Sequence, residues 1–269
     1  MNPTRRTFLA AGAAPLMAQA RKRPNILFVI ADDWGYGHAG AYGSKWVNTP
    51  GFDRVARDGV LFNNTFTSNP KCSPCRATIL TGRNSGQTKE AVNNYSIFPH
   101  DFAVYPQVLE DAGYFVGLTG KGWGPRDFKS TGWEHNPAGR EWRKRTLKPP
   151  TTGINSLDSA ANFEDFLTER PADKPFCFWL GGTEPHRAYE PGSGLRAGKR
   201  LADVVVPKYF PDNRAVRSDM LDYALEVEWF DKHLVRALDS VEKRGELDNT
   251  LVVVTSDHGM PFPRVKGQI

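Results

Sequence analysis

The sequence contains few of the features that stabilise small or repetitive proteins. Three cysteines in 269 residues cannot form the dense, even-numbered disulfide framework of a small secreted domain. No internal repeat and no low-complexity segment interrupts the chain. Hydrophobic residues make up 39% of it, enough to bury the core of one large domain. Stability must therefore come from a hydrophobic core.

A strong excess of one charge is also absent. The formal net charge is +5, and without Arg5 and Arg6 the 35 basic residues fall to 33, against 30 acidic ones. Basic residues are spread along the chain, apart from a cluster between Arg140 and Lys148. This pattern predicts no nucleic-acid partner, whereas an acidic small substrate or a polyanionic glycan remains compatible.

Residues 1–20 are typical of an export signal. Thr4-Arg5-Arg6-Thr7-Phe8-Leu9 leads into an apolar stretch that ends at Met17, and the small-residue site Ala18-Gln19-Ala20 follows. The stretch is too short to span a bilayer, so no stable membrane insertion is expected. The paired arginines resemble a twin-arginine signal, which predicts cleavage near Ala20, the twin-arginine export machinery as a partner, and a bacterial periplasmic or secreted location. An ordinary Sec signal and an uncleaved anchor are the alternatives.

Beyond the signal, residues 21–269 alternate short apolar runs with helical stretches, which predicts an α/β domain: a mostly parallel central sheet with helices on both faces. Asn25 to Ala31 is a continuous apolar run, as expected of a central strand. Further strands are predicted at Val60 to Phe66, Tyr114 to Thr119, Phe176 to Leu180 and Thr250 to Thr255. Helices are predicted at Gly51 to Asp58 with Thr49 as N-cap, Arg76 to Leu80, Pro106 to Ala112, Leu157 to Glu169 and Val216 to Arg244. Gly122 to Gly153 is predicted to be a long ordered loop.

Polar residues follow several of these strands directly. They are Asp32 and Asp33 after the first strand, Lys121 after the Tyr114 strand, Glu184 to His186 after the Phe176 strand, and Asp257 and His258 after the last. Because the carboxyl ends of parallel strands border one crevice, these side chains are expected to meet.

Three aspartates in one crevice would repel one another unless a cation joined them, which predicts a metal site. Aspartate oxygens favour Ca²⁺ or Mg²⁺, while the nitrogen of His258 leaves Mn²⁺ or Zn²⁺ open. Taken alone, Asp32-Asp33 equally fits a helix cap or turn, and Asp257-His258 a turn before Gly259.

The segment from Cys72 to Arg83 reads CSPCRATILTGR. Pro74 marks the start of a helix, so Cys72 is expected at a helix N-terminus, where free backbone N–H groups favour an anion. Arg76 adds a guanidinium suited to oxyanions. As a C-x-x-C pair alone, Cys72 and Cys75 fit a redox pair or half a zinc site, but there is no second such pair.

This segment resembles the signature of formylglycine-dependent sulfatases of the alkaline-phosphatase-like superfamily, in which the cysteine of C-x-P-x-R is oxidised to formylglycine. Further stretches match in the same order from Arg23 to the last residue: PNILFVIADDWGYG, TPGFDRVARDGVLFNNTF, TGK at Lys121, EPH at His186 and TLVVVTSDHG. The stretch SDHGMPFPRVKG is most similar to the heparan N-sulfatase-like branch.

The resemblance implies a sulfuric ester hydrolase that cleaves sulfate esters or N-sulfates of a sulfated carbohydrate, after a formylglycine-generating enzyme has converted Cys72. It implies five ligands of a calcium ion, with Mg²⁺ or another divalent ion as alternatives: Asp32, Asp33, the modified Cys72, Asp257 and His258. It also implies that Arg76 orients the modified residue. Lys121, His186 and Lys266 would bind the sulfate and assist the leaving group. A hydroxyl of hydrated formylglycine would attack sulfur, and its second hydroxyl would then release sulfate.

Two features depart from this family. Relatives commonly carry a histidine two residues after the lysine that matches Lys121, whereas this chain has Trp123. Either another base, such as His186 or Asp257, performs the release step, or turnover is slowed. Relatives also continue beyond the position of Ile269, so a truncated catalytic domain is expected, inactive or poorly soluble by itself. A phosphodiesterase or phosphonate hydrolase of the same fold and a non-catalytic glycan-binding protein are the competing interpretations.

Overall fold

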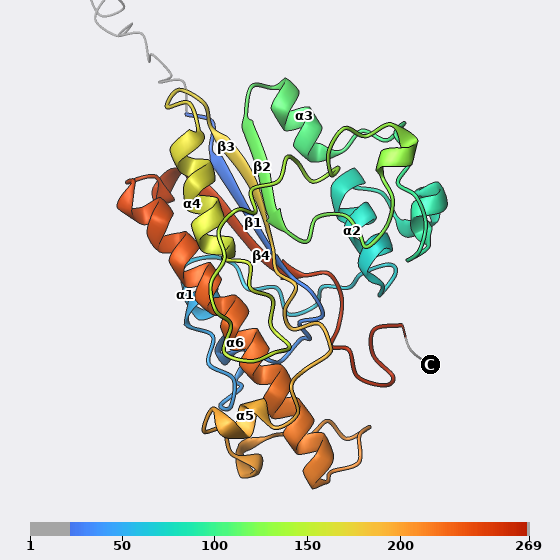
Figure 1. Ribbon diagram of the computed structural model, residues 1–269, viewed down its shortest axis with the longest axis vertical. Helices are drawn as coiled ribbons and strands as arrows, with labels where there is room; N and C mark the ends of the chain where they lie inside the picture. Colours follow the sequence, from blue (N-terminus) through green and yellow to red (C-terminus); the bar gives the residue numbers. More distant parts are fainter. Residues whose placement is uncertain (1–21, 268–269) are drawn as a thin grey trace, which may run out of the picture.

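The computed structural model describes residues 22–267 and contains one four-stranded parallel sheet with the order β2-β3-β1-β4 (Figure 1). The strands are β1 (Asn25–Ala31), β2 (Phe115–Gly120), β3 (Phe176–Gly181) and β4 (Thr250–Ser256). In the register, Val29 of β1 pairs with Leu180 on one side and Val254 on the other. The predicted α/β class is confirmed, with each of these strands within one residue of its expected bounds.

Six α-helices surround the sheet. They are α1 (Pro50–Asp58), α2 (Cys72–Thr81), α3 (Tyr105–Asp111), α4 (Ser159–Glu169), α5 (Ser193–Arg196) and α6 (Arg214–Lys243) among the described residues. In Figure 1, α1, α4 and α6 lie to one side of the sheet, and α2 and α3 to the other. Helices on both faces were expected from the continuous apolar strands.

The core forms two layers because successive strand residues point to opposite faces. Leu27 and Val29 of β1 pack with Phe163 of α4 and Leu234 of α6. Ile30, which follows Val29, packs on the other face, with Leu80 of α2. All six side chains are fully buried, and burial of each contributes about 1.5–3 kcal/mol. The two layers fix the sheet between the helices and so hold the ends of the strands in place.

The predicted strand at Val60 to Phe66 is wrong, because this segment forms no helix or strand. Val60, Phe62 and Phe66 are 78%, 69% and 87% exposed. Apolar alternation predicts a strand only if a neighbouring strand accepts its hydrogen bonds, and none of the four described strands pairs with this segment.

The start of α1 also differs from expectation. Thr49 is at the N-cap position, but its side chain makes no capping hydrogen bond. Instead, the backbone N–H groups of Gly51 and Phe52 donate to the carboxylate of Asp231 in α6, each at 2.8 Å. The cap of α1 is therefore supplied by a residue about 180 positions later in the chain.

The segment 122–153 is an ordered loop, as predicted, with a single 3-10 turn at Lys129–Thr131. It follows the free edge of β2, where the Leu118 N–H donates to the Arg140 carbonyl and the Trp142 N–H donates to the Leu118 carbonyl, both at 2.7 Å.

Residues 1–20, predicted to be an export signal, lie outside the described residues. Within residues 22–267, no helix combines the length and the apolar character needed to cross a membrane.

Candidate functional site

The polar residues that follow the strands meet at one place, as predicted. The Asp33 N–H donates to Asp257 Oδ1 at 3.1 Å, which joins the ends of β1 and β4. The Asp32 N–H donates to the Glu184 carbonyl at 3.1 Å, which joins the ends of β1 and β3. Lys121, just beyond β2, reaches Asp32 with its ammonium group. These three hydrogen bonds therefore tie the ends of the four strands to one another.

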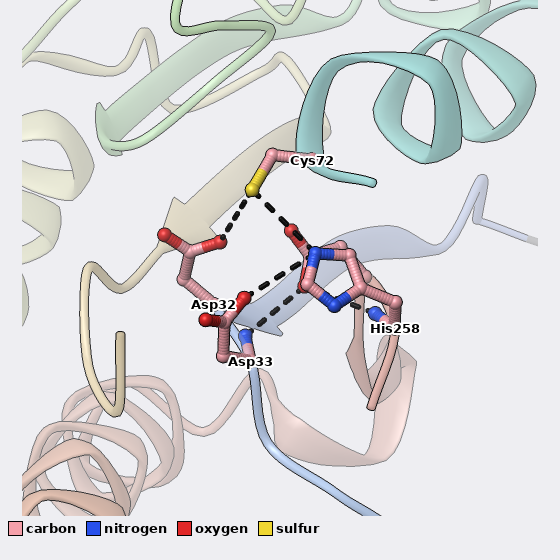
Figure 2. Close-up of side chains that lie close together, drawn as sticks. Asp32, Asp33, Cys72 and His258 are labelled. Carbon is pink, nitrogen blue, oxygen red and sulfur yellow. Dashed lines mark hydrogen bonds and ion pairs between the residues drawn. The ribbon is translucent and has the colours of Figure 1, made fainter. Parts of the chain in front are cut away.

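Five side chains form a compact cluster at this edge of the sheet: Asp32, Asp33, Cys72, Asp257 and His258. One potential ligand atom from each lies within 4.8 Å of all the others, and all five residues are buried. Figure 2 shows Cys72 entering from the first turn of α2 and facing Asp32 and His258. The set could bind a metal ion.

The donor atoms suit a hard divalent cation. Three carboxylates provide oxygen donors, and Asp33 Oδ1 is buried without a hydrogen-bond donor. The ring nitrogen Nε2 of His258 is 3.3 Å from that oxygen and 3.5 Å from Cys72 Sγ. A buried carboxylate oxygen without a partner is costly unless a cation or a proton satisfies it.

Positive groups border the cluster. Lys121 Nζ is 2.5 Å from Asp32 Oδ2, and Lys266 Nζ is 2.6 Å from Asp33 Oδ2. His186 Nε2 lies 4.0 Å from the same Asp33 oxygen. The three residues predicted to bind sulfate therefore all lie beside the carboxylates.

The two neighbouring aspartates have opposite pKa shifts. Burial favours a higher pKa for Asp32, but Lys121 and Arg76 outweigh it and hold the pKa of this carboxyl well below its ordinary value. Burial and the charge of Asp32 raise the pKa of Asp33, in spite of His258 and Lys266. Of these two carboxylates, Asp33 is thus the one whose charge the protein compensates less.

Cys72 is the first residue of α2, as the position of Pro74 predicted. The sulfur lies 3.6 Å from Asp32 Oδ1. The N-cap residue Lys71 makes no side-chain capping bond. The partial positive charge of the helix N-terminus is therefore directed at the position of the Cys72 side chain.

Arg76 is completely buried, and each of its hydrogen bonds goes to a protein atom. Its guanidinium group contacts Asp257 Oδ2 at 3.2 Å and Asp32 Oδ1 at 3.4 Å. It also donates to the carbonyls of Lys121 at 2.7 Å and Gly122 at 3.2 Å. These contacts position two acidic residues and the end of β2, rather than presenting the guanidinium to an anion from solvent.

Cys75 is engaged by the backbone beyond β4. Its Sγ donates to the Asp257 carbonyl at 2.5 Å, and burial raises the pKa of this thiol to about 12. A thiol that stays protonated is a poor nucleophile, which argues against a redox pair with Cys72.

Trp123, at the position where relatives commonly have histidine, does not face the cluster. Its side chain is 2% exposed and packs against Phe98, with ring centroids 5.1 Å apart. Its indole N–H donates to the Ser73 carbonyl in the first turn of α2. Nothing in the sequence pattern predicted this contact, because it joins two segments that are 50 residues apart.

The sequence profile of the family described as Sulfatase matches residues 24–267. Among curated proteins, the chain is 30% identical to human N-sulphoglucosamine sulphohydrolase, over 92% of this chain and 53% of that protein. It is 32% identical to N-acetylglucosamine-6-O-sulfatase of Bacteroides thetaiotaomicron, over 93% of this chain and 60% of that protein. The chain thus spans little more than half the length of these relatives.

Solved structures share the fold. A protein in complex with its substrate D-glucosamine-2-N,6-O-disulfate superposes with a TM-score of 0.68 and 23% identity, over 88% of this chain and 66% of the other. The phosphonate monoester hydrolase of Agrobacterium radiobacter superposes with a TM-score of 0.62 and 20% identity, over 88% and 63% of the two chains. At these identities the similarity establishes the fold alone.

Proposed function

The chain belongs to the sulfatase family, and from that premise we propose that the protein hydrolyses sulfate esters or N-sulfates of a sulfated carbohydrate. The observation that carries this proposal is the position of Cys72. Its side chain lies at the N-terminus of α2, inside a cluster of acidic ligands that is bordered by Lys121, Lys266 and His186. A sulfate group carries its charge on oxygen and needs such a cationic border.

In this proposal, Cys72 is converted to formylglycine by a formylglycine-generating enzyme. The residues that would hold a calcium ion are Asp32, Asp33, the modified Cys72, Asp257 and His258. When present, formylglycine would supply a hydrated aldehyde as the nucleophile, and the calcium ion would supply positive charge to the site. Arg76 keeps Asp32 and Asp257 in position, since it contacts both.

Lys121 and Lys266 bind the sulfate oxygens. Their side chains are 15% and 12% exposed, and each ammonium group contacts a buried carboxylate. A lysine in this position can contact a carboxylate and a sulfate oxygen with different protons, because its ammonium group has three donors.

His186 is our candidate for proton transfer in place of the histidine that Trp123 replaces. Its Nδ1 lies 2.5 Å from the Arg187 carbonyl, which fixes a proton on that nitrogen and leaves Nε2 as the acceptor in the neutral ring. Both Asp257 oxygens are already engaged, by backbone N–H groups and by Arg76. Asp257 is therefore a poor base, and we assign the release step to His186.

The names of the two relatives suggest the first substrates to test, namely N-sulfated glucosamine and 6-O-sulfated N-acetylglucosamine.

The proposed location is the periplasm or the exterior of a bacterium, because the signal pattern of residues 1–20 supports twin-arginine export. Export of a folded protein would require Cys72 to be converted in the cytoplasm before folding.

The proposal is tested by producing the protein together with a formylglycine-generating enzyme. Peptide mass spectrometry across Lys71 to Arg76 should show the mass loss of thiol-to-aldehyde conversion at Cys72. Turnover of an aryl sulfate should exceed that of an aryl phosphate. Cys72→Ala should abolish turnover, whereas Cys177→Ala, which changes a buried cysteine in β3, should not.

Two results would contradict the proposal. Faster turnover of the phosphate or of a phosphonate monoester would favour the activity named for the fold relative from Agrobacterium radiobacter. An intact thiol at Cys72 in a competent host, with sulfated-glycan binding that Cys72→Ala does not change, would favour a non-catalytic binding protein.

A further inference from the structure

Ser73, which directly follows Cys72, is held by two residues outside α2. It is fully buried. The Ser73 N–H donates to Asn94 Oδ1 at 3.1 Å, and its hydroxyl donates to the Asn94 carbonyl at 3.0 Å. The Ser73 carbonyl accepts the indole N–H of Trp123 at 3.1 Å. The N–H, the hydroxyl and the carbonyl of Ser73 are therefore each hydrogen-bonded to Asn94 or Trp123.

We propose that Asn94 and Trp123 are positioning residues that clamp Ser73 and thereby aim the Cys72 side chain at Asp32 and His258. The N-cap residue Lys71 makes no side-chain capping bond, so the free Ser73 N–H in the first turn of α2 has its acceptor outside the helix. The clamp from outside performs this task. The inference rests on the proposed function only in taking Cys72 as the reacting residue.

Trp123 is itself rigidly held. Its N–H donates to Asn136 Oδ1, and Asn136 Nδ2 donates back to the Trp123 carbonyl, both at 2.9 Å. Its ring is buried in a cluster with Phe98 and Trp133. A side chain fixed at backbone and ring can transmit its position to Ser73 through a single hydrogen bond. In this proposal, Trp123 acts by positioning the residue that follows Cys72, and it transfers no proton.

The matched pair of variants is Trp123→Phe and Trp133→Phe. Both remove an indole from the same buried cluster, but the Trp133 N–H has no hydrogen-bond partner within residues 22–267. The first readout uses protein made without a formylglycine-generating enzyme: the rate at which iodoacetamide alkylates Cys72, followed by peptide mass spectrometry. Cys177 serves as the internal reference, because it is buried in β3, outside α2, and burial raises the pKa of its thiol to about 12.

Trp123→Phe should raise the alkylation rate of Cys72 roughly 3- to 10-fold, since the loss of one buried hydrogen bond increases the population in which the first turn opens. Amide exchange of a peptide covering Lys71 to Arg76 should accelerate by a similar factor. Trp133→Phe should change neither. In converted enzyme, Trp123→Phe should lower kcat and leave KM within about twofold.

Equal alkylation and exchange rates in the two phenylalanine variants would overturn the clamp. If Trp123→Phe fails to fold, Asn94 provides the same test. Asn94→Ala should accelerate both rates, and Asn94→Asp, which keeps an acceptor for the Ser73 N–H, should not; identical rates in these two variants would also overturn the clamp. The thiol and exchange readouts need no turnover, so failure of the sulfatase proposal would leave this result interpretable.

Discussion

At the scale of single residues, the site is a balance of buried charges. Asp32 is compensated by Lys121 and Arg76, whereas Asp33 keeps an oxygen without a donor. Because like charges this close repel strongly in a low dielectric, the uncompensated oxygen is where a cation gains most. The acidic cluster is therefore arranged for an added positive charge.

Asp33→Asn should weaken Ca²⁺ binding by ~10- to 100-fold, because it removes a carboxylate with a buried oxygen that no donor satisfies. Isothermal titration calorimetry with calcium alone measures this. Asp101→Asn, an exposed aspartate paired with Lys89, is the control and should bind as the wild type does. Unchanged affinity in Asp33→Asn would remove Asp33 from the ligand set.

A second buried acid predicts a pH dependence of stability. Glu226 in α6 is 2% exposed, and neither carboxylate oxygen has a partner among residues 22–267. Burial, and then Glu184 and Asp222, raise its pKa to about 8. Between about pH 4.5 and 8 the folded state therefore binds more protons than the unfolded state. Stability should fall as pH rises through this window, by at most ~1.4 kcal/mol per pH unit.

Glu226→Gln should flatten this decline, since glutamine does not ionise. Thermal unfolding between pH 5 and 8 measures it, with Glu110→Gln, an exposed residue of α3, as the control. A parallel decline in Glu226→Gln and the wild type would show that another group is responsible.

At the scale of elements, helix ends are fixed by residues far away in the chain. Asp231 of α6 caps α1. Asp158 caps α4 by accepting from the Ala161 N–H, and it also accepts two bonds from Arg236 of α6. The long helix α6 thus orients both neighbouring helices on its face of the sheet.

Asp231→Ala should destabilise the protein by about 1–2 kcal/mol, because two N–H groups at the start of α1 lose their acceptor. Asp231→Asn, which keeps one acceptor oxygen, should lose less. Urea unfolding measures both, against Asp239→Ala on the same helix, whose contact with Arg54 is a 3.8 Å surface pair. A cost for Asp231→Ala no larger than that for Asp239→Ala would refute the cap.

At the scale of the whole molecule, the sheet has an open edge. Within residues 22–267, β4 pairs only with β1, and Leu251 is 55% exposed. An unpaired strand edge with apolar side chains favours association with other chains. Poor solubility stays a prediction from the sequence. The unpaired edge of β4 is the place where we expect chains to associate.

Leu251→Lys should reduce concentration-dependent self-association, since a charge on an edge strand opposes strand pairing. Light scattering over a range of protein concentrations measures it. Val108→Lys is the control, because Val108 is also 55% exposed but lies on α3. Equal reduction by both variants would point to a general effect of charge and not to the β4 edge.

The sequence by itself determined the features that local patterns encode. The continuous apolar run predicted the bounds of β1, and the helical spacing of apolar residues predicted α6 to within two residues at each end. The CSPCR segment predicted that Cys72 lies at the start of a helix. The meeting of the four strand ends also followed, because parallel strands leave no other place for the residues that come after them.

Only the tertiary structure decided which distant residues complete these elements. The cap of α1 by Asp231, the bond from Trp123 to Ser73 and the isolation of Glu226 depend on contacts between segments far apart in the chain. The extended segment from Val60 to Phe66 failed as a strand for the same reason, since pairing needs a partner that its own residues do not specify. Local periodicity fixes which face of an element is apolar, but the neighbour that satisfies its polar groups is set by packing.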